Sequence, residues 1–381
     1  MTLPERRALP LTFMGLTLPY GGVMEGRQTS KSPRPIQWWR RENLARRRPF
    51  LAARGRIREA VRRCLVERGL TEVETPAIQV SPGMEPGLRA FEVTLEEPGG
   101  AALPRYLHTS PEFAMKKLLA GGAGPIFQLA RTYRNGERSA THHPEFTMLE
   151  WYRPDADYRE LIGDCEALLA TAAEAAGRPA LTWQGLECRP GPPEILGVAE
   201  AFGRHAGIDL AATLPGGVPD LAALAARAAA IGIRSAEGDD WDDVFFRIFL
   251  ERIEPNLGHP RPTVLIDYPI HMAALARPRA DAPGLAERFE LYVAGLELAN
   301  AFGELTDPEE QRRRFVRDQT EKRRRMDFAY PIDEDFLAAL ADMPPASGIA
   351  LGFDRLVMLA SGAAAIEDVL WAPVEGSDEG P

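Results

Sequence analysis

The alternation of apolar and polar residues is clearest between Ile126 and Arg153, where it predicts two strands joined by a long polar loop. Successive side chains of a strand point to opposite faces. The second strand therefore divides its residues into two sets: Phe146, Met148, Glu150 and Tyr152 on one face, and Glu145, Thr147, Leu149 and Trp151 on the other. Each face combines apolar residues with a carboxylate, which favours the floor of a ligand pocket over a plain core. A surface hairpin with solvated charges is the alternative.

A second pair of strands is predicted between residues 287 and 304, with a turn near Gly295. Asn300, Phe302 and Glu304 are spaced to share one face. Glu290 and Glu297 lie on opposite arms of this hairpin, where they could converge. A pair of carboxylates is the usual protein contribution to a magnesium ion that also contacts substrate phosphates. The alternative is that both glutamates are exposed and form ion pairs with Arg or Lys.

The other predicted elements are mostly helices. Helical periodicity and end signals predict helices over 45–68, ending at Gly69, over 110–119, in much of the alanine-rich region 155–240, over 241–258, from Asp307 onward, over 333–342 and over 353–361. Strands are predicted over 71–78, ended by Pro76, over 262–269 and over 348–352. The helix 241–258 should bury Val244, Phe245, Ile248, Phe249 and Ile253.

Two helix starts carry residues with both structural and functional interpretations. Ser110, Pro111 and Glu112 fit a helix N-terminus as cap, first-turn proline and first-turn carboxylate, so capping alone explains them. Arg355 lies in the first turn of its helix, where the macrodipole disfavours a cation. A site that needs a planar guanidinium against phosphate or adenine would explain this arginine. A surface pair with Asp354 is the alternative.

Composition restricts the class of protein. The chain has 381 residues, 45% of them hydrophobic, and a formal net charge of −10, which argues against a strongly nucleic-acid-binding protein. Three widely spaced cysteines, Cys64, Cys165 and Cys188, suit a reducing cytoplasm and form no zinc motif. No apolar run of about 18 residues predicts a membrane span, and no signal peptide is expected. Residues 1–44 are expected to form a disordered extension, and 376–381 a short tail.

Three long stretches resemble one family. RTYRNGE…HHPEFTMLEWY (131–152), ERFELYVAGLELANAFGELTD (287–307) and GIALGFDRLVMLASG (348–362) are similar to motif 2, the amino-acid and metal segment, and motif 3 of class II aminoacyl-tRNA synthetases in their lysine-specific form. The helix, the strand and Pro76 before them resemble motif 1. The resemblance covers roughly residues 45–375. It implies an α+β catalytic domain, with a mostly antiparallel sheet flanked by helices, in a homodimer.

The resemblance also implies amino-acid activation with ATP and Mg²⁺. Arg134 and Arg355 are the expected catalytic residues, Arg134 on the α-phosphate and carboxylate and Arg355 on the adenine and γ-phosphate side. Phe146 would stack on the adenine, and Glu290 and Glu297 would hold magnesium. The full expected ATP set is Arg134, Asn135, Gly136, His142, His143, Phe146, Glu297, Leu298, Gly352 and Arg355.

The expected amino-acid pocket points to lysine. Glu150, Tyr152 and Glu304 would hold the distal ammonium, because a buried ammonium without acceptors costs several kcal/mol. Glu112 would receive the other amino group, and Asn300 would lie near the carboxylate. The full expected substrate set is Ser110, Pro111, Glu112, Glu150, Tyr152, Asn300, Glu304 and Ala350.

Two positions depart from the family pattern, and both lie near the expected adenine. Family members usually have Arg-Asn-Glu in motif 2, whereas this chain has Arg134-Asn135-Gly136 and carries Glu137 one place later. Members also usually have His-Asn before Pro-Glu-Phe, where this chain has His142-His143. Contact of Gly136 with ATP is therefore expected through its backbone only.

The branch of the family follows from the residues around the pocket and before motif 1. A lysyl-tRNA synthetase carries an N-terminal anticodon-binding OB-fold of about 100 residues or more, whereas only about 45 residues precede motif 1 here. No such barrel is expected. Ser110 and Ala350, where lysyl-tRNA synthetases usually have Ala and Gly, resemble the paralogous branch that attaches (R)-β-lysine to a lysine of elongation factor P.

This resemblance predicts an ATP-dependent ligase. It would form a lysyl- or (R)-β-lysyl-adenylate and transfer the acyl group to an ε-amine of elongation factor P, without tRNA. A minimal synthetase that charges tRNA, and an inactive paralogue that binds lysine or RNA, are the alternatives.

Overall fold

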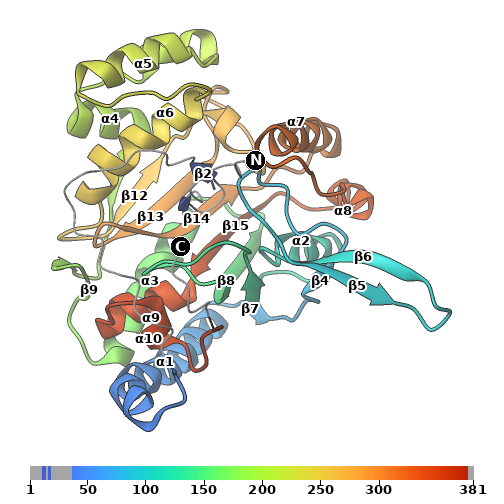
Figure 1. Cartoon of the computed structure of the whole chain (residues 1–381), viewed down its shortest axis with the longest axis vertical. Helices are drawn as coiled ribbons and strands as arrows, with labels where there is room; N and C mark the ends of the chain where they lie inside the picture. The colour runs from blue at the N-terminus through green and yellow to red at the C-terminus, as the bar shows by residue number, and fades with distance from the viewer. Residues whose placement is uncertain (1–10, 14–15, 19–36, 376–381) are drawn as a thin grey trace, which may run out of the picture.

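One eight-stranded sheet organises the computed structural model, which describes residues 11–13, 16–18 and 37–375 (Figure 1). In spatial order its strands are β11 (Glu194–Gly197), β12 (Thr263–Ile266), β13 (Arg288–Val293), β14 (Leu296–Gly303), β15 (Ala346–Gly352), β8 (Glu145–Pro154), β7 (Ile126–Tyr133) and β3 (Thr71–Glu72). All neighbours are antiparallel except the two edge pairs, β11 with β12 and β3 with β7. The predicted α+β class with a mostly antiparallel sheet is confirmed.

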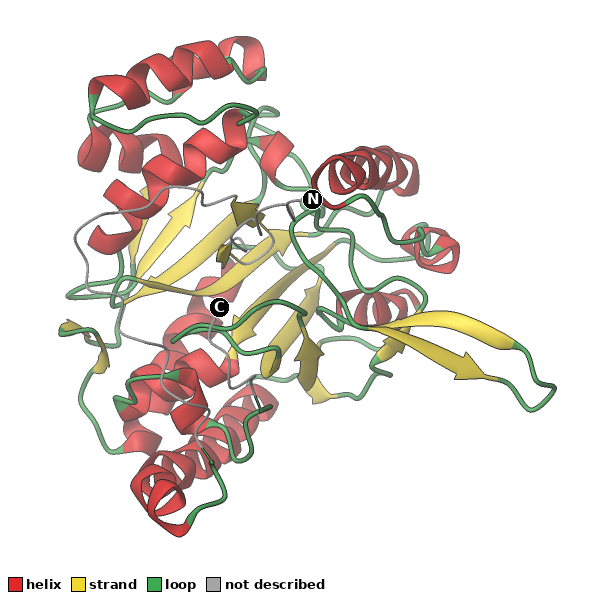
Figure 2. Ribbon diagram, viewed as in Figure 1, coloured by secondary structure: helices red, strands yellow, loops and turns green. Residues whose placement is uncertain are grey.

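Helices cover both faces of this sheet (Figure 2). The helices are α1 (Arg41–Glu67), α2 (Glu112–Ala120), α3 (Glu160–Ala176), α4 (Val198–Ala206), α5 (Leu221–Ala230), α6 (Trp241–Ile248), α7 (Pro308–Met326), α8 (Glu334–Leu340), α9 (Phe353–Ser361) and α10 (Ile366–Val369). On one face, α1, α3 and α9 pack on Leu149, Trp151 and Ile349 in a continuous apolar core. On the other face, α4 and α6 cover one end and α2 and α8 the other. The functional side chains lie between these two groups.

Three small sheets lie outside the large one. They are formed by β4 (Ile78–Gln79), β5 (Glu92–Glu96) and β6 (Ala102–Leu107), by β9 (Leu181–Trp183) with β10 (Leu186–Cys188), and by β1 (Leu11–Phe13) with β2 (Leu16–Leu18). The hairpin of β5 and β6 projects from the body of the molecule (Figure 1). Across the described residues, none of the helices combines the length and apolar content needed to cross a bilayer.

Several predicted elements are confirmed. The strands β7 and β8 pair antiparallel as expected, and β13 and β14 turn at Ala294 and Gly295, both with positive φ. Gly69 follows α1 with a φ of +84°, which glycine adopts without steric cost. The five apolar residues expected in the core between 241 and 258 are all at most 1% exposed.

Other boundaries differ from the prediction. Helix α1 begins at Arg41 and runs through Pro49. The strand predicted over 71–78 is reduced to β3 and β4, since Pro76 cannot donate a ladder hydrogen bond. The mainly helical prediction for 155–240 missed β9, β10 and β11. The expected extension 1–44 falls mostly outside the described residues, and the tail 376–381 wholly so. Within the extension, the structure has the short paired strands β1 and β2, which the prediction did not include.

Candidate active site

The site is built on one row of side chains that crosses the sheet. Glu290, Asn300, Ala350, Glu150 and Gln128 are directly opposite one another on β13, β14, β15, β8 and β7. Residues paired across neighbouring strands point to the same face. Register alone therefore brings together Glu290, Asn300, Ala350 and Glu150, of which Glu150 and Ala350 are 200 residues apart in the sequence.

A β-bulge adds Glu297 to the same face. The register between β13 and β14 shifts between Leu291 and Tyr292, so that Tyr292 is opposite Glu297 whereas Leu291 is opposite Ala299. The extra residue is Leu298, whose side chain is fully buried in the core under the sheet. Without the bulge, the odd spacing between Glu297 and Asn300 would place them on opposite faces. The predicted convergence of the two glutamates thus depends on this irregularity, and Leu298 offers a ligand only its backbone.

Glu150, Tyr152 and Glu304 converge at the end of the site next to α2. Tyr152 donates its hydroxyl hydrogen to Glu150 Oε2 at 3.0 Å, and Ser110 donates to Glu150 Oε1 at 2.5 Å. Gly348 is opposite Tyr152, and a β-carbon there would overlap both the Tyr152 ring and Glu304 Oε1. We refer to Glu150, Tyr152 and Glu304 together as the acidic group. Each of these three side chains is at most 3% exposed. The arrangement presents carboxylate oxygens in a dry pocket, as a buried ammonium requires.

The start of α2 differs in detail from the prediction. Pro111 is the N-cap residue, and Ser110 lies one place before it. Ser110 Oγ nevertheless accepts a hydrogen bond from the Glu112 backbone N–H at 3.0 Å while donating to Glu150. The capping and pocket interpretations of Ser110 therefore both hold in one side chain. Glu112 turns toward the same pocket, where Lys116 Nζ lies 2.5 Å from its Oε1.

Burial perturbs the titration of this acidic group. The pKa of Glu150 is raised to about 8, mainly by burial and next by the nearby charge of Glu112. Hydrogen bonds from Ser110 and Tyr152 oppose this increase. Burial likewise raises the pKa of Glu304 to about 7, although the Lys116 charge opposes this. Without a cationic ligand these carboxyl groups are therefore partly protonated near neutral pH. A bound ammonium would favour their ionised form.

The expected nucleotide residues Arg134, Phe146 and Arg355 lie at the other end of the site. The Arg134 guanidinium lies over the Phe146 ring, 5.2 Å from its centroid. Arg355 is 8% exposed; burial lowers its pKa, the charges of Glu297 and Glu137 oppose this, and the charge of Arg134 lowers it further. Arg134 and Arg355 are therefore close enough for their charges to interact.

Arg355 is held by protein groups along its edge. Nη1 donates to the Glu297 carbonyl at 2.9 Å and Nε to the Thr141 carbonyl at 3.2 Å, and Nη2 lies 2.8 Å from His142 Nε2. Gly352 lies against this side chain, and a β-carbon there would make an ordinary van der Waals contact with Arg355 at 3.4 Å. A guanidinium held by its edge keeps its planar face for stacking. Of the two expected contacts of Arg355, this geometry suits the adenine better than the γ-phosphate.

The residues expected to bind ATP in the motif 2 loop lie in different surroundings. Asn135 and Gly136 are exposed, and Gly136 has a φ of +86°. Glu137 is only 7% exposed and its charge acts on Arg355. His143 is 2% exposed; its Nδ1 is 2.5 Å from the Glu145 carbonyl and its Nε2 accepts from Val374 N–H at 3.1 Å. Both ring nitrogens of His143 thus contact backbone groups, one of them in the C-terminal segment.

Glu297 is suited to hold a cation. It is 1% exposed, and its Oε1 has no hydrogen-bond partner among the described residues. Burial raises its pKa well above the ordinary value, and the neighbouring charge of Glu290 raises it further. An orphaned buried carboxylate oxygen beside a second carboxylate is the environment that a divalent cation would stabilise.

Glu290 is more fully occupied by protein groups. Its Oε2 accepts from the hydroxyls of Tyr268 and Tyr292, both at 2.5 Å, and its Oε1 accepts from Arg288 at 2.6 Å. A third carboxylate, Glu254, lies close enough to both glutamates for their charges to interact. No cluster of three acidic, His or Cys side chains with a metal-binding arrangement occurs in the described part of the chain. A cation here would need further oxygen ligands, such as phosphates.

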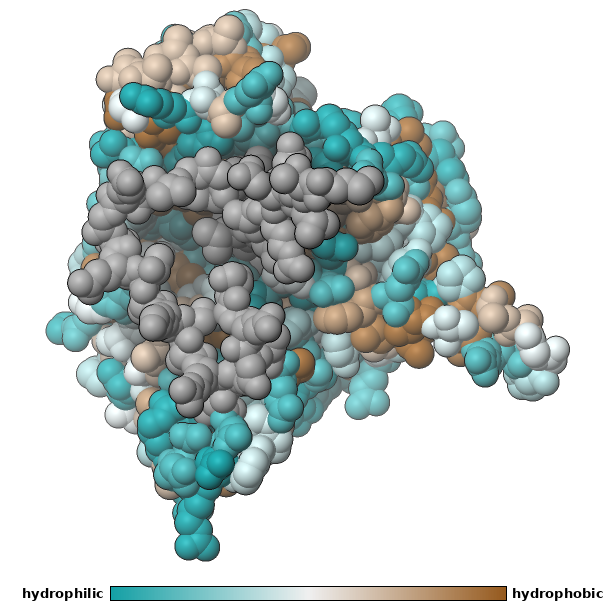
Figure 3. Space-filling view, viewed as in Figure 1, coloured by the Kyte–Doolittle hydropathy of each residue, from teal (hydrophilic) through white to brown (hydrophobic). Residues whose placement is uncertain are grey.

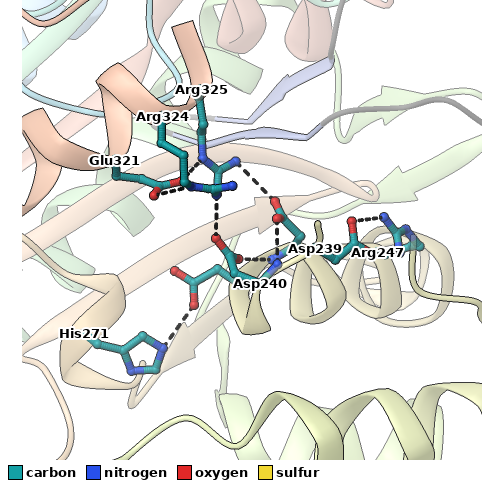
Figure 4. Close-up of polar contacts among 9 residues, drawn as sticks. Asp239, Asp240, Arg247, His271, Glu321, Arg324 and Arg325 are labelled. Atoms are coloured by element: carbon teal, nitrogen blue, oxygen red, sulfur yellow. Dashed lines mark hydrogen bonds and ion pairs between the residues drawn. The ribbon is translucent and has the colours of Figure 1, made fainter. Parts of the chain in front are cut away.

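A cavity of about 350 Å³ lies beside the acidic group, and it is lined by Ser110, which donates to Glu150, and by Glu112, which pairs with Lys116. Its inner lining includes Ser110, Glu112, Arg134, Asn300 and Ala350. Its lining continues to an ion-pair network between α6, α7 and the segment around His271 (Figure 4). In this network Arg325 is 2.9 Å from Asp240, Arg324 is 2.6 Å from Glu321, and His271 is 3.1 Å from Asp242. The volume is that of a small-molecule site.

Several residues of the site were missed from the sequence. Lys116 lies among the carboxylates of the acidic group, Arg288 and two tyrosines hold Glu290, and Glu254 adjoins Glu297. Glu254 comes from a short helical segment after α6, where it reads as an ordinary polar position. Lys116 has a weak signal, because it follows Glu112 at i+4 on a helix.

Comparison with known proteins agrees with this geometry. The model of the family described as tRNA synthetases class II (D, K and N) matches residues 32–375. The chain is 41% identical over 329 residues to a Pectobacterium atrosepticum protein named elongation factor P–(R)-β-lysine ligase, covering 85% of this chain and 95% of that protein. Proteins of the same name from Sodalis glossinidius and Klebsiella pneumoniae are each 42% identical, over 327 and 324 residues, with at least 84% of this chain and 94% of theirs covered.

Proposed function

The chain belongs to the class II tRNA synthetase family (D, K and N), and from this we propose that it is an ATP-dependent ligase acting on a protein lysine. It activates (R)-β-lysine, or lysine, as an aminoacyl-adenylate and transfers the acyl group to an ε-amine of elongation factor P. The observation that carries this proposal is the convergence of Glu150, Tyr152 and Glu304 in a buried pocket.

The acidic group accounts for selection of a substrate with a distal ammonium. In this proposal Glu150 and Glu304 ionise around the ammonium, and Tyr152 keeps Glu150 in place. Glu112 receives the second amino group, and Asn300 lies near the carboxylate. A neutral side chain would make none of these ion pairs and would leave Glu150 and Glu304 without a cationic partner in a dry site, which disfavours it relative to an ammonium.

The first chemical step joins the substrate carboxylate to ATP. A carboxylate oxygen attacks the α-phosphorus, and pyrophosphate leaves with the electrons of the broken P–O bond. Arg134 neutralises the α-phosphate, and the face of Arg355 and Phe146 hold the adenine, so catalysis rests on positioning and charge neutralisation. Magnesium held by Glu297 and Glu290 supplies charge neutralisation at the phosphates.

The second step transfers the acyl group. The acceptor amine attacks the adenylate carbonyl, the C–O bond to the phosphate breaks, AMP leaves, and the amine loses a proton. The relatives named for elongation factor P support a protein acceptor over tRNA. Ser110 and Ala350, in place of the smaller Ala and Gly usual in lysyl-tRNA synthetases, support a β-amino acid over α-lysine.

We also propose a homodimer, working in the cytoplasm. Hydrophobic residues gather near the base of the projecting β5–β6 hairpin (Figure 3). Ile78 of β4, which pairs with β6, is 45% exposed, and Val80 is 40% exposed. These residues follow the segment that resembles motif 1. Sedimentation equilibrium of wild-type protein and of a variant with both residues changed to Ser tests this, with monomer expected for the variant.

One experiment decides between the acceptors. Pure enzyme, ATP and (R)-β-lysine are incubated with elongation factor P or with tRNA, and products are measured by mass spectrometry and by acid-precipitable label. Addition of one β-lysyl group to elongation factor P and none to tRNA is expected. Charging of tRNA with an unchanged elongation factor P would reject the proposal in favour of a minimal tRNA synthetase.

A further inference from the structure

A resident ammonium group already occupies the acidic pocket. Lys116 of α2 is 1% exposed, and its Nζ lies 2.5 Å from Glu112 Oε1 and 2.6 Å from Glu304 Oε2. Lysine is almost never fully buried unless it is paired. Burial alone would lower its pKa, but the charges of the two glutamates outweigh burial and raise the pKa above its ordinary value. Lys116 is therefore a permanent positive charge between two carboxylates assigned to the substrate.

The charges of the groups around Lys116 indicate what this lysine contributes to substrate binding. Three carboxyl groups, Glu112, Glu150 and Glu304, are assigned to the substrate's ammonium groups, and one resident ammonium, Lys116, lies among them. With all four ionised, their sum is −3 + 1 = −2. A further buried carboxyl group beside Glu112, that of Glu85, is offset by the charges of Arg134 and Lys322 and is left out of the sum. A diamino acid brings two ammonium groups to this end of the site, while its own carboxylate lies toward Arg134. The pocket is neutral when such a substrate is bound, and it would hold an excess negative charge without Lys116.

We propose that Lys116 is a specificity-determining positioning residue, which sets the pocket charge to match a substrate with two ammonium groups and holds Glu304 in place to receive one of them. The inference rests on the proposed function, since it presumes a diamino-acid substrate. A simpler role, a clamp between α2 and β14 that only stabilises the fold, predicts different results for the variants described next.

The first test is Lys116→Met, assayed by amino-acid-dependent exchange of pyrophosphate into ATP. Loss of the Lys116 charge leaves Glu112, Glu150 and Glu304 with one negative charge more than two ammonium groups neutralise, and removes the ion-pair partner of Glu304. At pH 7.5 the KM for (R)-β-lysine should therefore rise at least about tenfold, while the KM for ATP changes less than about twofold. The charged and titratable groups that act on Glu304 or are acted on by it are Lys116, Glu112, Arg277, Glu150 and Tyr152.

The neighbouring Lys117→Met is the matched control. Lys117 is on the same helix, but its Nζ pairs with Asp333 and Asp335 at 2.9 and 2.8 Å, away from the pocket. This variant removes the same charge from the same element and should keep the wild-type KM values and pH profile.

The double variant Lys116→Met/Glu304→Gln separates charge matching from a structural clamp. Glu304→Gln alone leaves a pocket charge of −1, whereas the double variant restores −2 through Glu112 and Glu150. Charge matching predicts a KM for (R)-β-lysine below that of either single variant. A structural clamp predicts that the two substitutions have additive effects on the binding free energy, so that the KM of the double variant exceeds that of either single variant.

The outcomes are distinguishable from failure of the proposed function. Absence of (R)-β-lysine-dependent exchange in the wild type would reject both proposals. An active wild type with an unchanged KM in Lys116→Met, or a double variant as impaired as the two single changes combined, would overturn the inference alone. If Lys116→Met does not fold, the comparison of the double variant with Glu304→Gln still decides, because charge matching predicts that the second substitution lowers the KM.

Discussion

Replacing Gly348 with alanine should disable the ammonium pocket while leaving the nucleotide end intact. Gly348 lies on β15 directly opposite Tyr152. A β-carbon at this position would come closer than 3.0 Å to the Tyr152 ring and to Glu304 Oε1, which real β-carbons essentially never do. Tyr152 and Glu304 are 3% and 1% exposed, so neither can turn away into solvent. Both must move inside a packed site.

The magnitude follows from overpacking. Forcing one methyl group into a packed core costs about 1–3 kcal/mol. A displacement of about 1 Å in the ammonium acceptors should raise the KM for (R)-β-lysine about 10- to 100-fold, since each 1.4 kcal/mol corresponds to about tenfold in binding. The KM for ATP should stay within about twofold, because the nucleotide residues lie at the other end of the site.

The assay is pyrophosphate exchange with each substrate titrated in turn, together with urea unfolding. Gly203→Ala is the matched control: Gly203 is in α4, is exposed, and has no heavy atom within 4 Å of its β-carbon position. It should gain up to about 1 kcal/mol of stability and keep both KM values. A Gly348→Ala enzyme with a wild-type KM for (R)-β-lysine would refute the reasoning.

Four further predictions concern the same framework. Because the pKa of Glu150 is raised to about 8, the KM for (R)-β-lysine should fall as pH rises from 6 to 8.5, and Glu150→Gln should weaken this dependence; a flat wild-type profile contradicts it. Arg54→Met removes the ion-pair partner of the buried Asp354 and should lower the free energy of unfolding, measured in urea, by about 3–5 kcal/mol. A decrease of less than about 1 kcal/mol would show that the pair contributes little to stability. Glu297→Gln should raise the Mg²⁺ concentration for half-maximal exchange severalfold, and an unchanged requirement would place the metal elsewhere. His143→Ala should lower the melting temperature with no change in the KM for ATP, because its ring nitrogens bind backbone groups; an increase in that KM would return His143 to the nucleotide site.

The parts of the fold that depend on local pattern were predictable. The alternation in β8 put Glu150 and Tyr152 on one face and Leu149 and Trp151 on the other, and the structure has them in the pocket and the core respectively. Periodicity is local, so it survives in the folded chain wherever one face of an element is buried. The same reasoning identified the turn at Gly295.

The parts that depend on long-range register were not predictable from the residues alone. Strict alternation places Glu297 and Asn300 on opposite faces, and only the bulge at Leu298 brings them together. Lys116 looks like one more charged helix position in the sequence; only the fold places Glu304, the residue after β14, against it. Strand β11 is short and follows a proline-rich segment, and its pairing partner β12 comes more than 60 residues later. A bulge, a buried ion pair and a distant strand pairing are tertiary outcomes.

The measurement that tests the central claim most directly compares two substrates in the exchange assay. One is (R)-β-lysine, and the other is (R)-3-aminohexanoic acid, the same molecule without its distal ammonium. A pocket in which Glu150, Tyr152 and Glu304 bind that ammonium predicts a kcat/KM at least about 100-fold higher for (R)-β-lysine, from the several kcal/mol lost when buried carboxylates have no partner. Equal rates of exchange with the two compounds would contradict the account.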